Sequence, residues 1–156
     1  MRIWFHIIVA LAGAHLHRLG RTEWAIRHQV DTQVERYYPD AASAFSQPPS
    51  TPIAFGRDGI PVFVTGNLAA VHRTCHSALF VGCHSFAYVN GRRVPWIVVY
   101  GGDLWSIALD HEIIETLGDP WDNGVELCDP VEGETYVWHG VYLSNFIKPS
   151  GRAAMR

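Results

Sequence analysis

The chain of 156 residues is long enough for one domain with a sizeable core, and its 48% hydrophobic and 12% aromatic residues predict a packed interior. With 17% charged residues, 14 glycines and 9 prolines, the composition excludes a disordered or low-complexity chain. The formal net charge of −3 gives no reason to expect a nucleic-acid partner, so we expect a single domain over residues 1–156 that binds no nucleic acid.

The first fourteen residues allow two interpretations. Residues 3–10 are apolar, and a first β-strand that leads into a helix is the preferred prediction. The alternative is a signal peptide, because the small residues at 12–14 resemble a cleavage site, but the apolar run is short and His6 interrupts it. No other run approaches the ~18 apolar residues that a membrane-spanning helix needs, so no membrane partner is expected.

Three further segments are predicted before residue 70. Apolar residues at helical spacing, followed by a proline, predict a helix from Thr22 to about Tyr38. Residues 41–52 are rich in Ser, Pro and Ala and predict a loop. The β-branched run at 60–65, bounded by glycines, predicts a short strand.

Two β-hairpins are predicted in the second half of the chain. Residues 78–100 have a two-residue Asn-Gly turn, which is the strongest short-range hairpin signal. The second arm, residues 94–100, is almost continuously apolar, so we expect it in the middle of a sheet. The other hairpin is predicted at 135–138 and 141–144.

Between the hairpins the sequence predicts a helix that begins at Asp103, as its N-cap, and ends at Gly118. Pro120 prevents the helix from continuing. The expected fold is therefore α+β, a small mixed sheet with an N-terminal helix and this second helix packed on one face.

The acidic residues are concentrated on and after this second helix. Ten of the fifteen Asp and Glu residues lie between positions 103 and 134, and no Lys or Arg lies between Val94 and Ile147. Like charges at this density repel one another unless they are solvated or gathered around a cation. A solvated acidic face is the plain interpretation, but the motif inside the window favours a cation. The ten residues are Asp103, Asp110, Glu112, Glu115, Asp119, Asp122, Glu126, Asp129, Glu132 and Glu134.

The motif is His111-Glu112-Ile113-Ile114-Glu115, an HExxE string. His111 and Glu115 are four residues apart, so on a helix they project side by side and can ligate one metal ion. Glu112 is rotated by about 100° from His111, where a general base for a metal-activated water belongs. A bare HExxE string is also common on helices as exposed charge, so its context decides its weight.

The chain after the motif supplies that context. The helix breaks at Gly118, seven residues after His111, and the loop that follows offers further carboxylates as a third ligand. Among them we rank Glu126 before Asp129. If this segment is helical both can approach the ion, and if it is extended only one can. Asp119 and Asp122 are assigned to turns or to orienting roles instead.

These segments resemble a family of small HExxE metallopeptidase-like proteins of bacteria and tailed bacteriophages. The resemblance covers about residues 81–149 and rests on WSIALDHEIIETLGDPWDN, VELCDPVEGETY and HGVYLSNFIKP, with GCHSF and NGRRVPWIVV upstream. A more distant similarity is to plant Exordium-like proteins, which share the HExxE helix and an acidic pair three residues apart. The resemblance implies a zincin-like single domain.

Carried over residue by residue, the family's pattern points to His111, Glu112, Glu115, Asp119, Glu126 and Asp129. The chain departs from the pattern with Asp110 in place of Ser and with Cys83 where the family often has an aromatic residue. Neither departure removes a ligand. A His in the family's strand corresponds to His84, and zincins dock substrate backbone on an edge strand beside the site helix. We therefore expect His84 to belong to the site.

Three cysteines, Cys75, Cys83 and Cys128, fit no disulfide framework. We expect free or buried thiols in a reducing compartment, with one disulfide as the alternative. A cytoplasmic or virion-associated location is accordingly preferred to secretion. A second zinc site at Cys75-His76 and Cys83-His84 matches no common zinc spacing and is not favoured.

The sequence therefore predicts a metal-dependent peptidase in which His111, Glu115, Glu126 and Asp129 supply the ligands and Glu112 the base. The metal is expected to be Zn²⁺, but a His with several carboxylates weakens its Lewis acidity and keeps Mn²⁺ and Ca²⁺ open. The partner would be a peptide or protein substrate. The rival hypothesis is a non-catalytic, metal-stabilised structural protein that contacts virion proteins.

Overall fold

The computed structural model describes residues 5–10, 19–38, 60–119, 124, 126–131 and 133–155. Its main sheet has four strands in the order β1-β2-β4-β3. β1, β2 and β4 are parallel to one another, and β3 runs antiparallel to β4. The strands are β1 (Phe5–Ala10), β2 (Ile60–Thr65), β3 (Gly82–Val89) and β4 (Arg92–Tyr100). The sheet is thus mixed, and β4 lies inside it, as its apolar sequence predicts.

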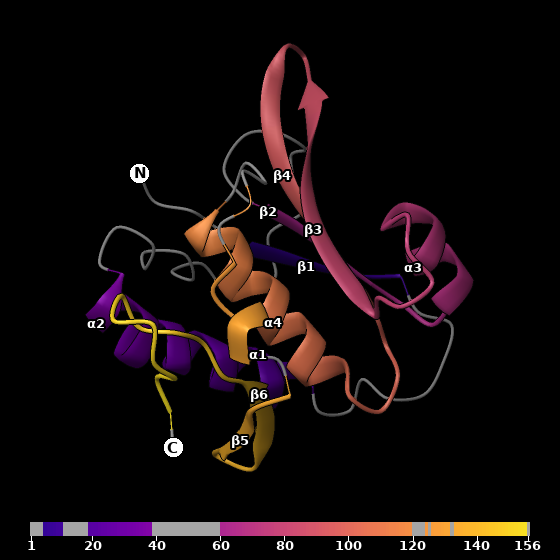
Figure 1. The fold of residues 1–156 in the computed structure, drawn as a ribbon. Coiled ribbons are helices and arrows are strands. Elements are labelled where there is room, and N and C mark those ends of the chain that lie inside the picture. The colour runs from indigo at the N-terminus through magenta and orange to yellow at the C-terminus, as the bar shows by residue number, and fades with distance from the viewer. Residues whose placement is uncertain are drawn as a thin grey trace.

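The helices gather on one side of this sheet, and α4 crosses in front of it (Figure 1). α1 lies beside α4, and a second, two-stranded sheet made of β5 and β6 lies below α4 in the same view. The elements are α1 (Leu19–Gln29), the π-helical turn η2 (Val30–Val34), α2 (Glu35–Tyr37), α3 (Leu68–Thr74), α4 (Trp105–Gly118), the 3-10 turn η3 (Asp129–Val131), β5 (Thr135–Trp138) and β6 (Val141–Ser144). The architecture is a small α+β domain, as expected.

Most predicted elements have the predicted bounds. The strand at 60–65, the Asn-Gly hairpin, the hairpin at 135–144 and the end of α4 at Gly118 are all confirmed. The first helix begins at Leu19 and contains a π turn, so it is longer and less regular than predicted. The predicted loop at 41–52, the small residues at 12–14 and the first two residues of the predicted strand at 3–10 lie outside the described residues.

Two expectations were wrong. Asp103 is not the N-cap of α4, because the helix begins at Trp105 and Leu104 occupies the cap position without a side-chain bond. The Trp105 N–H is donated to the Gly102 carbonyl instead. The expectation of three free thiols was wrong as well, because Cys75 and Cys83 form a disulfide. Cys75 follows the end of α3 and Cys83 lies at the start of β3. Their Cα atoms are 5.8 Å apart, which is within disulfide range.

The core lies between the sheet, α1 and α4, and α4 is buried on almost all sides. Of its residues from Ala108 to Leu117, all but His111 are buried. One face meets Val62, Val64, Ile97 and Val99 of the sheet within a single hydrophobic cluster. The same cluster contains Leu127, Cys128, Val141, Leu143 and Phe146, which close over the other side of the helix. Between Ala108 and Leu117, every polar side chain except the one at position 111 therefore sits in the interior.

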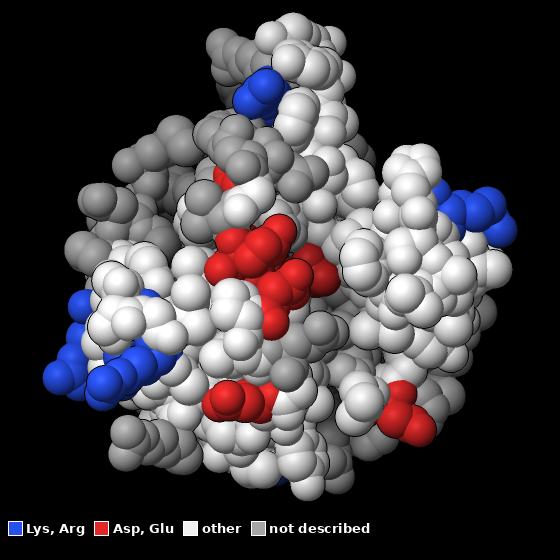
Figure 2. All heavy atoms as spheres, viewed as in Figure 1, with Lys and Arg blue, Asp and Glu red and all other residues white. Residues whose placement is uncertain are grey.

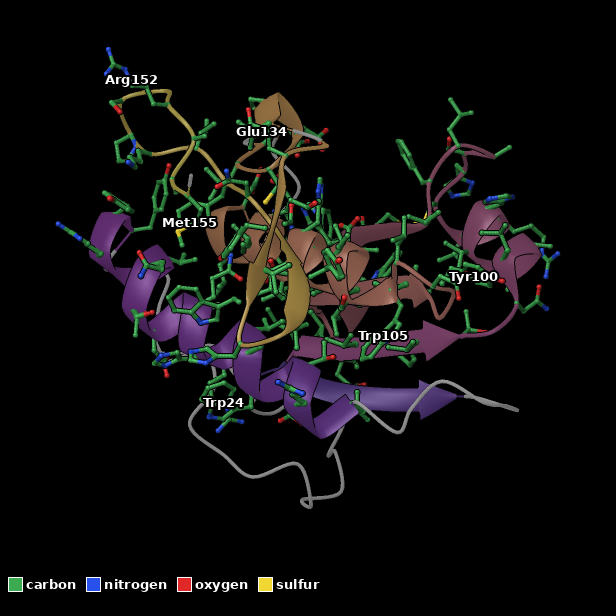
Figure 3. All side chains as sticks on the ribbon, turned by 90° about the horizontal axis from the view of Figure 1, so that it is seen from below. Trp24, Tyr100, Trp105, Glu134, Arg152 and Met155 are labelled. Atoms are coloured by element: carbon green, nitrogen blue, oxygen red, sulfur yellow. A yellow bond between two sulfur atoms is a disulfide. The ribbon has the colours of Figure 1, made fainter. Side chains whose placement is uncertain are left out.

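The hairpin of β5 and β6 is held against α1 by a contact at its turn. Arg21 donates two hydrogen bonds, of 3.0 and 2.7 Å, to the carbonyl oxygen of His139. The His139 ring lies 4.7 Å from that of Trp24, on the outer side of α1 (Figure 3). No helix among the described residues is long and apolar enough to span a membrane.

The packing at the end of α4 yields a test of the fold. A Cβ on Gly118 would come within 2.5 Å of the buried Leu127 side chain, whereas a Cβ on Gly20 of α1 meets nothing within 4 Å. Gly118→Ala should therefore destabilise the protein by about 1–3 kcal/mol through overpacking, although alanine favours helix. Gly20→Ala should be neutral or stabilising by up to ~1 kcal/mol. Urea unfolding of both variants measures this, and a neutral Gly118→Ala would show that Leu127 does not pack there.

Candidate metal centre

Three carboxylates of α4, those of Asp110, Glu112 and Glu115, are buried, with residue exposures of 0%, 8% and 1%. Asp and Glu are almost never buried in this way unless they are paired. Each of the three has a different partner in a different part of the fold. The partners explain why the helix carries acids where its neighbours are apolar, and they define the site.

Glu115 binds the backbone of the segment that follows the acidic loop. Its Oε2 accepts the N–H of Leu127 at 2.8 Å, and its Oε1 accepts the N–H groups of Cys128 and of Asp129, the latter at 3.3 Å. One side chain thus satisfies three successive backbone donors at the start of η3. These bonds fix the segment against α4 and carry Asp129 to the helix surface.

His111 and Asp129 meet at that surface. The distance from His111 Nε2 to Asp129 Oδ1 is 3.0 Å, and the distance from His111 Nε2 to Glu115 Oε1 is 3.9 Å. One ligand atom from each of the three residues lies within 4.8 Å of the others. The sequence prediction that His111 and Glu115 share a helix face is confirmed, and Asp129 joins them.

The donor set and its spacing fit a divalent cation. Zinc bonds of about 2.0–2.2 Å to nitrogen and oxygen, in a tetrahedron, place the donors roughly 3.4 Å apart. The observed separations of 3.0 and 3.9 Å lie on either side of that value. An ionised carboxylate offers about four lone-pair positions. The N–H groups of Cys128 and Asp129 take both positions on Glu115 Oε1, and that of Leu127 takes one on Oε2, so the position left for a cation is on Oε2. Figure 2 shows acidic side chains gathered at the centre of this face of the molecule.

Glu126, which the sequence analysis ranked above Asp129, is not in the group. The chain at residues 126–128 is not helical, and the 3-10 turn begins only at Asp129. The segment is neither the expected helical turn nor a strand, and among the described residues only Asp129 of the two carboxylates joins His111 and Glu115. Glu126 is exposed and acts on Glu115 only as a like charge nearby. Asp119 is buried at the end of α4 outside the group, and Asp122 lies outside the described residues.

Burial raises the pKa of Glu115 to about 7, against the lowering effect of the Leu127 and Cys128 N–H groups. Burial also raises the pKa of the Cys128 thiol well above its ordinary value. This thiol contacts the His111 carbonyl oxygen at 3.8 Å. Cys128 is therefore a packing residue behind the site, and its raised pKa disfavours the thiolate that a metal ligand or nucleophile requires.

Glu112 faces β3 and lies about 100° around α4 from His111. Its Oε2 lies 3.2 Å from Nδ1 of His84, and the two side chains are both about nine-tenths buried, with exposures of 11% and 10%. An ionised carboxylate only accepts hydrogen bonds, so the proton of this bond belongs to His84 Nδ1. His84 is thus in direct contact with the residue expected to be the base, and its role in the site stays a prediction. β3 is an edge strand of the described sheet, as that prediction requires.

Gly82 makes room for Glu112, and the sequence analysis missed it. A Cβ at this position would lie 3.1 Å from Glu112 Cγ and 3.2 Å from its Oε1. Gly82 and His84 are two residues apart on β3 and so share the face that meets α4. A glycine in a strand marks a close approach of this kind, but the sequence does not say to what.

Asp110 points to the third side of α4, toward β6. Its Oδ2 accepts the N–H of Ser144 at 2.8 Å, and its Oδ1 is buried without a hydrogen-bond partner among the described residues. Gln29 of α1 donates to the carbonyl oxygen of Ser144 at 3.2 Å, so three elements meet here. Burial raises the pKa of Asp110 well above its ordinary value, against the lowering effect of the Ser144 N–H.

Polar side chains of the β5–β6 hairpin and the disulfide cysteines are not part of the candidate metal centre. The Tyr136 hydroxyl is buried and the Tyr142 side chain is exposed, with its carbonyl oxygen bound by Ser106. His139 packs against Trp24 and Trp138. A second zinc site with Cys75 and Cys83 as thiolate ligands is wrong, because the two form the disulfide.

Comparisons with known proteins add no relative. No protein-family model matches the sequence, and neither a curated protein nor a solved structure is significantly similar to it.

The structure predicts that Asp129 contributes more to metal binding than Glu126 does. Asp129→Asn should weaken the binding of Zn²⁺ or Mn²⁺ at least tenfold, because even residues that only orient a ligand cost about that much. Glu126→Gln removes the same charge from an exposed position and should weaken binding less than about threefold, through loss of long-range attraction alone. Isothermal titration of both variants decides between them. Equal losses, or a larger loss for Glu126→Gln, would contradict the placement of Asp129.

The buried Asp110 predicts a pH dependence. A carboxylate whose pKa is raised by folding stabilises the fold below its unfolded pKa of about 3.9, and that stability is lost as the pH rises through its folded pKa. Asn cannot ionise, but its Oδ1 still accepts the Ser144 N–H. The advantage of Asp110→Asn over wild type should therefore grow from pH 4 to pH 8 in metal-free protein. Urea unfolding at each pH measures it, with the exposed Asp103→Asn as control, and a constant difference would count against the buried charge.

Proposed function

We propose that this protein is a metal-dependent peptidase that hydrolyses an amide bond at the centre built on α4. The observation that carries the proposal is that the polar side chains of the motif separate into two groups. His111 and Glu115 converge with Asp129, while Glu112, which lies between them in sequence, is held apart by His84. Three ligands and a separate base are the components of metal-assisted hydrolysis.

His111, Glu115 and Asp129 would hold the cation. It would supply Lewis acidity, which lowers the pKa of a water molecule and polarises a substrate carbonyl. One imidazole and two carboxylates form a harder and more negative set than three imidazoles. Zn²⁺ remains our first choice, and Mn²⁺ and Ca²⁺ are the alternatives that this donor set favours.

Glu112 would accept the proton of the attacking water and pass it to the leaving amine. The His84 Nδ1–H would fix Oε2 of that carboxylate, and Oε1 would take the proton. Gly82 keeps the adjacent space free of a side chain. His84 is in this account a positioning residue, since it acts through Glu112.

β3 would align the substrate. Its residues pair with β4 on one side, and it is the last strand on that edge of the described sheet. An extended peptide can add to such an edge through backbone hydrogen bonds, which fix its direction with little regard to sequence. The substrate class that follows is an extended peptide or an unfolded segment of a protein.

A second function is favoured by one observation. Glu115 already binds three backbone N–H groups, so a cation at His111 and Asp129 would also join α4 to the segment at 127–129. A metal ion with this role would stabilise the fold of a non-catalytic protein, such as a virion component. The two functions share the metal and differ in the need for Glu112.

The test uses that difference. Wild type should bind close to one divalent ion per chain, and Glu112→Gln should retain the ion and the fold but lose at least ~10²-fold in peptide hydrolysis, because an amide cannot accept the proton. Glu126→Gln makes the same change at an exposed position and should keep its activity. Elemental analysis and a mass-spectrometric assay on a synthetic peptide library provide the two measurements.

Each outcome has a clear meaning. Full activity of Glu112→Gln would contradict the mechanism. A wild-type protein that binds metal but cleaves nothing with Zn²⁺, Mn²⁺ or Ca²⁺ would favour the structural role. A protein that binds none of the three ions would remove both proposals.

A further inference from the structure

The segment between α3 and β3 displays three consecutive apolar side chains to solvent. Leu79 is 89% exposed, Phe80 51% and Val81 49%. Single exposed apolar residues are ordinary, whereas neighbouring exposed apolar side chains are typical of interaction surfaces. A ligand that binds Leu79, Phe80 and Val81 would therefore carry apolar groups of its own.

The run is held in place by its surroundings. The Cys75–Cys83 disulfide closes the segment on both sides of it. The Ser77 N–H binds the His72 carbonyl oxygen of α3 at 3.1 Å, and within the closed loop the Leu79 N–H binds Ser77 Oγ at 3.2 Å. The Val81 carbonyl oxygen accepts the Tyr100 N–H at 2.7 Å and so extends the pairing with β4. A loop ordered before binding loses little entropy when a ligand arrives.

The same loop adjoins the proposed base. Val81 directly precedes Gly82, whose added Cβ would touch Glu112 at 3.1 Å. One residue beyond the disulfide, His84 binds Glu112. Consecutive Cα atoms are about 3.8 Å apart, so the apolar run begins within a few residues' length of the carboxylate. Figure 2 shows the surface over α3 and this segment, to the right of the central acidic cluster, as uncharged apart from a basic group at its outer edge.

We propose that Leu79, Phe80 and Val81 form an apolar subsite that selects peptide substrates with a large apolar side chain beside the bond to be cleaved. An extended peptide along β3 would place its backbone on the strand edge and one of its side chains against this loop. The disulfide holds the loop and the base as one unit, so the side chain that is recognised and the bond that is cut keep a fixed spacing. This inference rests on the proposed peptidase function and adds its specificity.

The experiment compares two sets of substitutions in the metal-loaded full chain. Leu79→Ser with Phe80→Ser removes the apolar tips of the loop and touches neither the ligands nor Glu112. Val137→Ser is the matched control, because Val137 is 55% exposed on β5, away from the loop. The substrates are synthetic peptides of one sequence that differ only in Leu, Phe, Ser or Gly beside the cleaved bond.

The double variant should lose roughly tenfold in kcat/KM on the Leu and Phe peptides, mainly through KM, and less than twofold on the Ser and Gly peptides. Val137→Ser should match wild type on all four. Calorimetry in a Glu112→Gln background should show the same loss of affinity for the Phe peptide without any turnover. Metal content and melting temperature should not change.

The contrary results are distinct from one another. A wild type that cleaves all four peptides alike, or a double variant that keeps the apolar preference, overturns the subsite and leaves the peptidase function standing. A wild-type dimer that the double variant converts to monomer shows that the run is a self-contact, which also overturns the subsite. A wild type that binds metal and cleaves none of the peptides removes the subsite together with the function on which it rests.

Discussion

The carboxylate of Glu115 organises the structure around the candidate site. By accepting the N–H groups of Leu127, Cys128 and Asp129 it attaches a segment twelve to fourteen residues away in sequence to the middle of a buried helix. Leu127 can follow only because Gly118 has no side chain in its path. Asp129 then arrives 3.0 Å from His111, and the candidate metal centre is the consequence. Burying an ionised carboxylate costs free energy, and desolvation raises the pKa of Glu115 to about 7. A cation beside Glu115 would offset part of this cost.

The other buried acids of α4 also have hydrogen-bond partners. Asp110, Glu112 and Glu115 leave the helix in three directions, toward β6, β3 and the start of η3, and each meets a donor that the fold has already placed. Only His111 among the residues 108–117 escapes burial, so this stretch of α4 reaches solvent at one position. A buried helix normally carries apolar side chains. Polar residues at such positions are expected mainly at functional sites. That pattern supports a role in chemistry, while a purely structural metal would not require Glu112 and His84 to be paired.

Sequence reasoning predicted the elements well where local chemistry determines them. The Asn-Gly turn, the β-branched strand at 60–65 and the glycine that ends α4 each act through their own backbone preferences, and the HExxE spacing follows from helix geometry. It failed where the outcome depends on contacts between distant segments. The choice of Asp129 over Glu126 depends on three backbone bonds to Glu115, the disulfide depends on where α3 ends relative to β3, and Gly82 matters only because Glu112 lies against it. None of these contacts produces a periodic pattern in the sequence.

The central claim is that a cation belongs between α4 and the start of η3. Anomalous diffraction at the zinc edge, from crystals grown with Zn²⁺, tests it most directly. The account predicts one anomalous peak at about 2.0–2.2 Å from His111 Nε2, Asp129 Oδ1 and a carboxylate oxygen of Glu115, with the Glu112 carboxylate outside bonding distance. A peak bound to Glu126 in place of Asp129, or no peak at the site while His111 and Asp129 remain in direct contact, would contradict it.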